Sequence, residues 1–260
     1  MLLANVDEDD ENAKTLIQSK VYQKKKKKQL AKQIEGYMNV IADKDVKTVS
    51  DYLNVMYNEG FLTQNYALNK QGVNVIMLIN QKLLIKAVTY NTENIPLSKR
   101  LYNNVEKAKK DIIAEISRGL SIGASTSDMA RNLENTMRVS FRKDYMIAQN
   151  EGVRVREEAI IDSLYEVKRK GADIVKRWSA TLDGKTRPVH RELEGKWVEV
   201  DEYFQYNGGK VFTPKQFGIA SEDINCRCTV IGVPRWELED TYVKRDNINS
   251  ELVKVSGYQD

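Results

Sequence analysis

The sequence predicts an α+β protein: a mostly helical N-terminal part with a long helix leading into a small C-terminal module of antiparallel strands and a short helix. Two observations support this fold class. Apolar residues recur at helical spacing along the first two thirds of the chain. After Gly171 they occur instead in short alternating runs bounded by turn residues, which is typical of strands. Since 260 residues exceed the usual size of one domain, we expect two folded units.

Three helices are predicted before residue 90. The first covers residues 12–34, around a run of lysines. The second covers residues 49–57, and Gly60 is placed to end it, because glycine is common just beyond the end of a helix. The third covers residues 73–88.

The clearest N-terminal helix follows residues 94–96, where an asparagine precedes a proline at the start of the pattern. Its apolar side chains are spaced by three and four, which predicts one buried stripe. Gly119 and Gly123 are expected to close the helix. The stripe consists of Leu97, Leu101, Val105, Ala108, Ile112 and Ile116.

A longer helical region comes next. Ser125 lies three residues before Asp128, a spacing that resembles a capping box at a helix start. From there to Lys170 the chain contains no proline and only Gly152 as a glycine, and Gly171 is placed to end the helix. The pattern predicts one long or kinked helix that connects to the C-terminal module.

Three strand regions are predicted beyond residue 171. Residues 175–181 alternate and stop at an Asp-Gly turn, residues 203–212 form a hairpin around an Asn-Gly pair, and residues 228–233 form a further strand. We therefore expect four regions: a helical N-terminal region at 1–120, a connecting helix region at 121–171, a compact module at 172–234 and a polar C-terminal tail at 235–260.

The composition indicates a folded protein outside the membrane. A hydrophobic share of 41% and a charged share of 30% are ordinary for a globular chain. No apolar stretch approaches the roughly 20 residues needed to cross a bilayer, and the first residues do not resemble a secretory signal. The two cysteines are one residue apart, unlike a disulfide framework, and predict a reduced compartment such as the cytoplasm.

Charge is segregated near the start of the chain. Residues 7–11 are all acidic, and five lysines follow in a row: Lys24, Lys25, Lys26, Lys27 and Lys28. Such a run neutralises phosphates in non-specific binding of double-stranded DNA. The alternative is a solvated helix face balanced by the acidic run. The sequence leaves both interpretations open.

The most informative residues lie between 178 and 228. This ordered set resembles the phage Mu F-like head-morphogenesis family, whose motif ends in Cys-Arg-Cys, and the residues at 148–151 resemble the helical segment that precedes the module in that family. The matching residues are Trp178, Asp183, Thr186, Arg187, His190, Leu193, Gly195, Pro214, Cys226, Arg227 and Cys228.

The resemblance implies a structural role and no enzymatic activity. Members of this family are minor capsid proteins associated with the portal and the interior of a bacteriophage head, and act in head assembly and in DNA packaging or delivery. The implied partners are portal and scaffold or capsid proteins and non-specific double-stranded DNA, with no membrane. The implied location is the interior of the virion head, and the host cytoplasm during assembly.

A cluster of polar residues within the motif has two interpretations. Asp183, His190, Cys226 and Cys228 could form a mixed tetrahedral zinc site, because thiolates and imidazole are ligands that zinc prefers. The spacing of the cysteines is tighter than the usual Cys-x-x-Cys. We therefore favour a structural cluster without a cofactor, in which His190 and the cysteines form hydrogen bonds inside a small core.

The rival function is a phosphodiester hydrolase. In it Asp183 or His190 would act as a base, while Arg187 or Arg227 would bind phosphate. The sequence shows no set of clustered carboxylates for a pair of metal ions. Asp183 before Gly184 is instead expected to cap the helix that carries Arg187 and His190.

Overall fold

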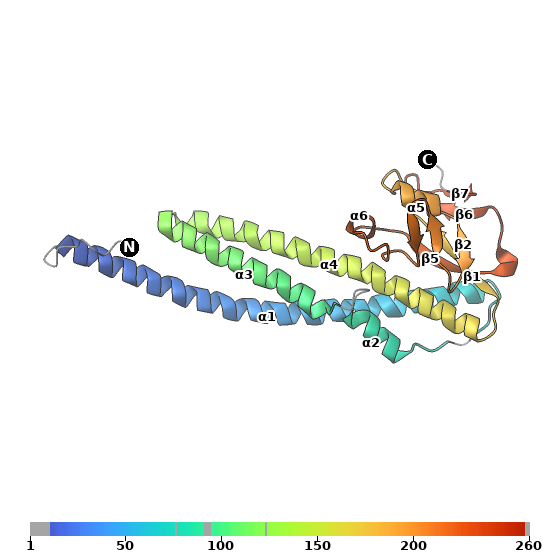
Figure 1. Ribbon diagram of the computed structural model, residues 1–260, viewed down its shortest axis with the longest axis horizontal. Helices are drawn as coiled ribbons and strands as arrows, with labels where there is room; N and C mark the ends of the chain where they lie inside the picture. The colour runs from blue at the N-terminus through green and yellow to red at the C-terminus, as the bar shows by residue number, and fades with distance from the viewer. Residues whose placement is uncertain (1–10, 76, 91–94, 123, 258–260) are drawn as a thin grey trace. The chain divides into compact units, whose positions relative to one another are not determined.

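The computed structural model describes residues 11–75, 77–90, 95–122 and 124–257, and it confirms the α+β fold class (Figure 1). The chain divides into two compact units. Unit 1 joins Met1–Val46 to Arg100–Asp144, and unit 2 joins Lys47–Lys99 to Tyr145–Asp260. Each unit is therefore assembled from two separate segments of sequence, unlike the four consecutive regions expected above.

Unit 1 consists of helical segments packed side by side (Figure 1). They belong to α1 (Glu11–Lys70), α3 (Leu97–Ile122) and α4 (Thr126–Arg169). Most of the apolar stripe predicted on α3 is buried, and in unit 1 its side chains pack against α1. This core contains Met38, Ala42, Val105, Ala108 and Ile112, with Ile34, Ile116 and Leu133 partly buried against it.

Polar contacts also link the helices of unit 1. Lys109 Nζ lies 3.1 Å from Glu35 Oε1, across α3 and α1. Asn104 donates to Asp144 Oδ1 at 2.7 Å, across α3 and α4. Gly119 lies inside α3 and does not close it: an added Cβ would lie 2.6 Å from Met129 Cγ, so the glycine permits close helix packing. Gly123, the other expected end, lies outside the described residues.

The connecting helix is confirmed as α4, a single helix of 44 residues. The backbone N–H of Asp128 donates to Ser125 Oγ at 3.1 Å, and the Ser125 hydroxyl donates back to the Asp128 carboxylate at 2.7 Å. Gly171 ends the helix with a φ of 91°, a conformation that glycine adopts without strain. Both terminal signals in the sequence were therefore interpreted correctly.

The boundaries of all three helices predicted before residue 90 are wrong. Residues 12–34 and 49–57 belong to one helix, α1, and Gly60 lies inside it. An added Cβ at Gly60 would lie 2.6 Å from the backbone oxygen of Arg156, so this glycine is required by packing. The helix predicted at 73–88 is only α2 (Gln81–Thr89), because Asn80 caps it by accepting from the backbone of Lys82.

Unit 2 contains a three-stranded antiparallel sheet in the order β2-β1-β5. The strands are β1 (Ile174–Ser179), β2 (Trp197–Glu199) and β5 (Thr229–Pro234), and β1 pairs with both others. The predicted hairpin is confirmed as β3 (Phe204–Tyr206) and β4 (Gly209–Val211). Two short helices complete the module: α5 (Pro188–Leu193) and α6 (Ala220–Asp223).

The expected polar tail is instead structured. It contains a short 3-10 helix, Arg235–Glu237, and an antiparallel pair, β6 (Tyr242–Arg245) and β7 (Leu252–Val255). Lys244 Nζ lies 2.8 Å from the buried carboxylate of Glu194, to which the Tyr242 hydroxyl also donates. Val255 is buried as well. The segment is anchored mainly by polar contacts, which a search for hydrophobic alternation does not detect.

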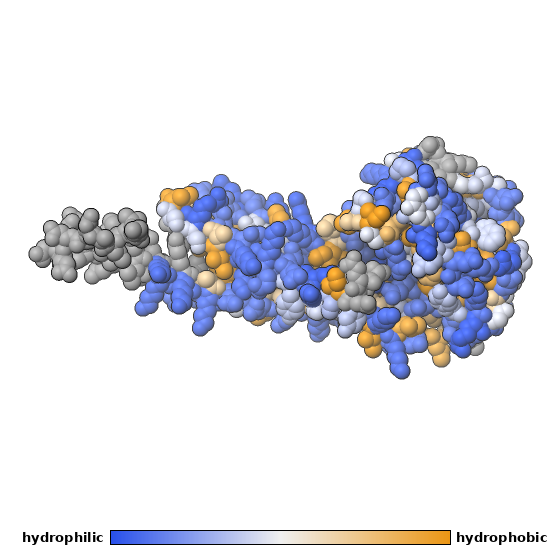
Figure 2. Space-filling view, in the orientation of Figure 1, coloured by the Kyte–Doolittle hydropathy of each residue, from blue (hydrophilic) through white to orange (hydrophobic). Residues whose placement is uncertain are grey.

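Buried polar side chains fasten the helices of unit 2 to its sheet. The backbone N–H of Gly232 donates to Gln64 of α1 at 3.2 Å, and that of Val230 donates to Glu157 of α4 at 2.9 Å. Hydrophilic residues predominate on the face drawn in Figure 2, and the hydrophobic ones form small separate patches. None of the helices in the described part of the chain is long and apolar enough to span a bilayer.

Candidate functional site

The candidate site is built around Trp178, a fully buried side chain of β1. Its ring meets Phe204 edge-on, with ring centroids 5.3 Å apart, and Phe217 at 5.9 Å. His190 of α5 lies 6.3 Å from the same ring and 4.8 Å from Phe217. These aromatic contacts hold the imidazole in one orientation inside the module.

The turn after β1 places Asp183 beside Arg227. Arg227 donates to both carboxylate oxygens, at 2.8 Å to Oδ1, and lowers the pKa of Asp183 to about 2. The backbone N–H of Lys185 also donates to this carboxylate, at 2.9 Å. The prediction that Asp183 caps α5 is therefore wrong. Arg187 is the N-cap of α5 and forms no side-chain cap bond.

Two neighbouring motif residues stabilise the same turn. The Thr186 hydroxyl donates to a backbone carbonyl within the turn at 2.5 Å. Arg187 donates to the carbonyls of Glu222 and Ile224 at 3.1 and 2.7 Å, which joins the start of α5 to the end of α6. Arg187 is thus engaged with backbone groups.

Gly195 lets the chain turn back along β1. It has a φ of 78°, and its N–H donates to the carbonyl of Trp178 at 3.1 Å. An added Cβ would lie 3.0 Å from the hydroxyl oxygen of Tyr242. Both the backbone conformation and the lack of space favour glycine at this motif position.

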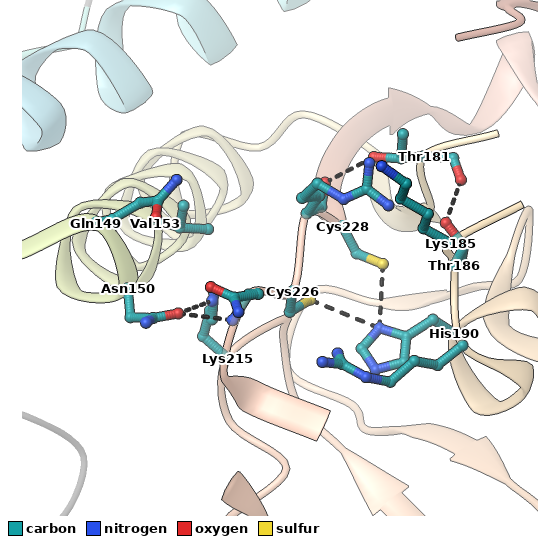
Figure 3. A pocket seen from close by; sticks show the side chains of 13 residues that line it. Gln149, Asn150, Val153, Thr181, Lys185, Thr186, His190, Lys215, Cys226 and Cys228 are labelled. Atoms are coloured by element: carbon teal, nitrogen blue, oxygen red, sulfur yellow. Dashed lines mark hydrogen bonds between the residues drawn. The ribbon is translucent and has the colours of Figure 1, made fainter. Parts of the chain in front are cut away.

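His190, Cys226 and Cys228 converge in the core of the module, as Figure 3 shows. His190 Nδ1 lies 3.2 Å from Cys228 Sγ and 3.6 Å from Cys226 Sγ. The other ring nitrogen, Nε2, lies 3.0 Å from the carboxylate of Glu222. The nitrogen and sulfur atoms of the three residues all lie within 4.8 Å of one another, and all three side chains are buried.

The two thiols influence each other's ionisation. A hydrogen bond from Cys228, together with the nearby His190, lowers the pKa of Cys226 against the effect of burial. The same pairing and burial raise the pKa of Cys228. The pair therefore favours one negative charge over two, because two adjacent thiolates repel each other.

The long helix α4 contributes Asn150, whose side-chain oxygen holds the loop before the cysteines. It accepts from Lys215 Nζ at 2.6 Å and from the backbone N–H of Asn225 at 2.8 Å. Lys215 also donates to the carbonyl of Asp223 at 2.6 Å, and burial lowers its pKa. The segment at 148–151 thus positions the Cys-Arg-Cys loop.

A cavity of about 420 Å³ lies next to the cluster, and His190, Cys226 and Cys228 form part of its wall. The wall is basic: it includes Lys185, Arg187, Lys215 and Arg227 and contains no carboxylate. Its remaining residues are Gln149, Asn150, Val153, Thr181, Thr186 and Asn225. Such a wall favours water or a small anion over a cationic ligand.

Of the four residues that the sequence analysis grouped into one cluster, His190, Cys226 and Cys228 meet in the structure and Asp183 does not. Asp183 is held by Arg227 and is outside the group of described residues whose ligand atoms converge on His190. The functional role of all four residues stays a prediction. The lysine run lies on α1, and Lys24, Lys25 and Lys28 are exposed, whereas the side chains of Lys26 and Lys27 lie outside the described residues.

The sequence analysis missed Glu222, Asn150 and Lys215 as parts of the site. Glu222 lies four residues before Cys226 and Lys215 follows Pro214, so both were inside the motif region. Their roles depend on the fold of two loops, and no local pattern marks them. The sequence analysis also missed Glu157, a fully buried carboxyl group. Burial removes this group from water and raises its pKa to about 8.

The chain is similar to one protein family and to individual proteins of two differently named kinds, an ADP-ribosyltransferase and a minor head protein. The model of the family described as "Phage Mu protein F like protein" matches residues 110–231. An NAD(+)–arginine ADP-ribosyltransferase, EFV, of Enterococcus faecalis is 31% identical over 253 residues, which are 96% of this chain and 51% of that protein. Minor head protein GP7 of Bacillus phage SPP1 is 29% identical over 235 residues, 86% of this chain and 75% of that protein.

The coverage of these matches differs. The chain spans about half the length of the Enterococcus protein and three quarters of the phage protein. The family match begins within α3 and ends within β5, so it includes the turn at Asp183, His190 and the two cysteines. No solved structure matches the chain.

Proposed function

We propose that the chain, whose residues 110–231 match the model of phage Mu protein F-like proteins, is a minor structural protein of a tailed-phage head. The observation that supports the proposal most is the likeness to a minor head protein along 86% of the chain. Within a head, its role is in assembly and in DNA packaging or delivery.

The helices are consistent with a role in an assembly. α1 has 60 residues and α4 has 44, whereas the average helix of a globular protein has about 11–12. Helices of this length present long rows of side chains that a neighbouring protein can contact. We propose that the partners are portal, scaffold or capsid proteins, and that the protein resides inside the head after assembly in the host cytoplasm.

DNA contact is the second part of the proposal. Lys24, Lys25 and Lys28 are exposed on α1, where ammonium groups can reach phosphates without burying charge. Contacts of this kind recognise the charge of the backbone and not the base sequence. The binding would therefore be non-specific and strongly dependent on salt.

The decisive experiment examines phage particles. Particles from the phage or prophage that encodes the chain would be purified by density gradient, treated with protease and nuclease, and analysed by mass spectrometry. We expect the full chain inside DNA-filled heads, at far lower copy number than the major capsid protein. Its absence from heads, while it is abundant in the same lysate, would contradict the proposal.

Two enzymatic candidates stand against this proposal. A phosphodiester hydrolase that uses Asp183 or His190 is poorly supported by the geometry, because Asp183 is paired with Arg227 and His190 is buried between Glu222 and the thiols. Arg187, the proposed phosphate ligand, is engaged with backbone carbonyls. Metal-dependent cleavage of plasmid DNA that is lost in a folded His190→Ala variant would revive this candidate.

The second candidate is transfer of ADP-ribose from NAD(+) to arginine, which the name of the Enterococcus relative suggests. Because the chain also aligns with a head protein over most of its length, we propose that the shared region provides the structural role. Incubating the purified chain with labelled NAD(+) and an arginine-rich acceptor tests this. Label transferred to arginine by the chain would establish an enzyme.

A further inference from the structure

The cluster of His190, Cys226 and Cys228 has the composition and arrangement of a metal site. We propose that it binds one zinc ion through His190 Nδ1 and the two Sγ atoms, with the fourth coordination position facing the adjacent basic cavity. The inference goes beyond the structural role proposed above and does not depend on it.

The distances within the cluster fit a tetrahedral ion. Zinc bonds of about 2.3 Å to sulfur and about 2.0–2.1 Å to nitrogen place neighbouring ligand atoms roughly 3.4–3.8 Å apart. In this protein the nitrogen lies 3.2 and 3.6 Å from the two sulfurs. All three atoms lie within 4.8 Å of one another, so the distance between the two sulfurs needs to shorten by at most about 1 Å to reach tetrahedral geometry.

Hydrogen bonding alone does not satisfy this arrangement well. A ring nitrogen carries either one proton or one lone pair, so His190 Nδ1 can form one good hydrogen bond in the ring plane. Two sulfurs, however, lie close to this nitrogen in the buried core. A cation placed among the three atoms would satisfy both thiolates and the nitrogen at once.

The surroundings of His190 resemble the support that metal ligands usually have. Its Nε2 lies 3.0 Å from the Glu222 carboxylate, and a histidine that binds metal commonly donates its other N–H to a carboxylate. That hydrogen bond places the proton on Nε2 and leaves the Nδ1 lone pair directed at the sulfurs. Contacts with Trp178 and Phe217 fix the plane of the ring.

The short spacing of the cysteines is compatible with chelation. Side chains two residues apart in extended backbone point to the same side, and the residue between them points to the other. Arg227, the intervening residue, is bound to Asp183. Both sulfurs lie near His190 Nδ1, at 3.2 and 3.6 Å, while Arg227 is engaged by the carboxylate of Asp183.

The ligand set selects the metal. Thiolates and imidazole favour zinc over magnesium or calcium, which require oxygen ligands. No carboxylate lines the cavity, and Asp183 is occupied by Arg227, so the fourth ligand would be a water molecule or a small anion. Binding would require both sulfurs as thiolates and would release any proton that the pair still holds, with no change of oxidation state.

Cobalt(II) substitution of the full-length protein tests the proposal. Protein that has been reduced and stripped with a chelator would be titrated with Co²⁺, which gives thiolate charge-transfer bands and intense visible bands in a tetrahedral site. We expect saturation at one ion per chain and displacement by Zn²⁺. Because the sequence contains only these two cysteines, any thiolate band must come from them.

Single substitutions distinguish the proposed metal ligands from the residues that lie beside them. Cys226→Ser and Cys228→Ser should lose tight binding, and His190→Ala should change the visible bands. Glu222→Gln should keep the spectrum but weaken the affinity by about 10–100-fold, because it supports a ligand without being one. Val153→Ala is the matched control: Val153 lines the same cavity from α4 and has an apolar side chain that offers no metal ligand, so spectrum and affinity should not change.

The wild-type titration alone can overturn the proposal, even if the cysteine variants fail to fold. Folded, reduced wild-type protein that develops no thiolate–cobalt band at saturating Co²⁺ would show that the cluster does not bind metal. An unaltered spectrum in a folded His190→Ala variant would remove His190 from the ligand set and overturn the site as proposed.

Discussion

Unit 1 and the site in unit 2 depend on different kinds of contact. In unit 1 a repeated apolar stripe on α3 packs against α1, and several similar side chains share the burial. In unit 2 the site depends on single contacts between residues far apart in sequence, such as Glu157 with Val230 and Asn150 with Asn225. A repetitive interface is therefore expected to tolerate a substitution that would disrupt the site.

The largest expected effect is a difference in stability loss between a core substitution in unit 2 and one in unit 1. Trp178→Ala should destabilise the protein by roughly 3–5 kcal/mol, because it removes a fully buried aromatic side chain that positions His190. Val105→Ala in unit 1 should cost less, since a smaller side chain is lost from a repeated stripe. Urea unfolding followed by circular dichroism measures both, and equal losses would contradict the comparison.

A pH experiment should distinguish the buried carboxyl group of unit 2 from ordinary surface acids. Burial raises the pKa of Glu157 to about 8, so the folded state holds its proton more tightly than the unfolded state. Its contribution to stability is complete below the unfolded pKa of about 4.5 and is lost as the pH rises toward 8. The melting temperature of chelator-treated protein should therefore fall between about pH 5 and about pH 7.5.

Glu157→Gln supplies the control for this pH dependence. The amide keeps an oxygen that can accept from the backbone N–H of Val230 but does not ionise. The decline in melting temperature should be smaller in the variant. If wild type and variant show the same pH profile, another group causes the change.

Two glycines of α1 sharpen the comparison between the units. Gly60→Ala in unit 2 should cost about 1–3 kcal/mol, because the new Cβ would overlap the backbone of Arg156. Gly36→Ala in unit 1 meets no atom within 4 Å and should stabilise the helix by up to about 1 kcal/mol. Thermal melts of both variants check the signs, and a neutral Gly60→Ala would indicate looser helix packing.

The smallest expected effect concerns the exposed lysines. Replacing Lys24, Lys25 and Lys28 with Gln should leave stability unchanged and reduce the salt dependence of DNA binding, by up to about 0.9 in the log–log slope per phosphate contact. Fluorescence anisotropy with a short duplex at several salt concentrations measures the slope. A triple variant at Lys82, Lys86 and Lys254, which are exposed in unit 2, is the matched control.

The sequence predicted elements whose signals are local. The start of α4 at Ser125, its end at Gly171 and the hairpin around Asn207 and Gly208 depend on residues within one turn of each other. Gly60 was misinterpreted because a glycine can either end a helix or allow another helix to pack closely against it. In this protein it allows close packing against α4, about 100 positions later in the sequence. Nothing near Gly60 in sequence distinguishes the two.

The candidate site was predicted in part for the same reason. A recognisable motif contained His190, Cys226 and Cys228, and the fold brings them together. The motif did not indicate that Arg227 would pair with Asp183, because that contact joins the loop after β1 to the loop before β5, 44 residues later. Glu222 was missed because two adjacent acids on a four-residue helix form no distinctive pattern.

The distribution of tryptophan confines tryptophan fluorescence to one of the two units. The sequence has three tryptophans, Trp178, Trp197 and Trp236, and all belong to the segments of unit 2. Trp178 is fully buried beside His190, whereas the other two are 49% and 62% exposed. Selectively excited tryptophan emission would therefore report the melting of unit 2, while helical ellipticity would report both units. A gap between the two melting curves would measure how independently unit 1 unfolds.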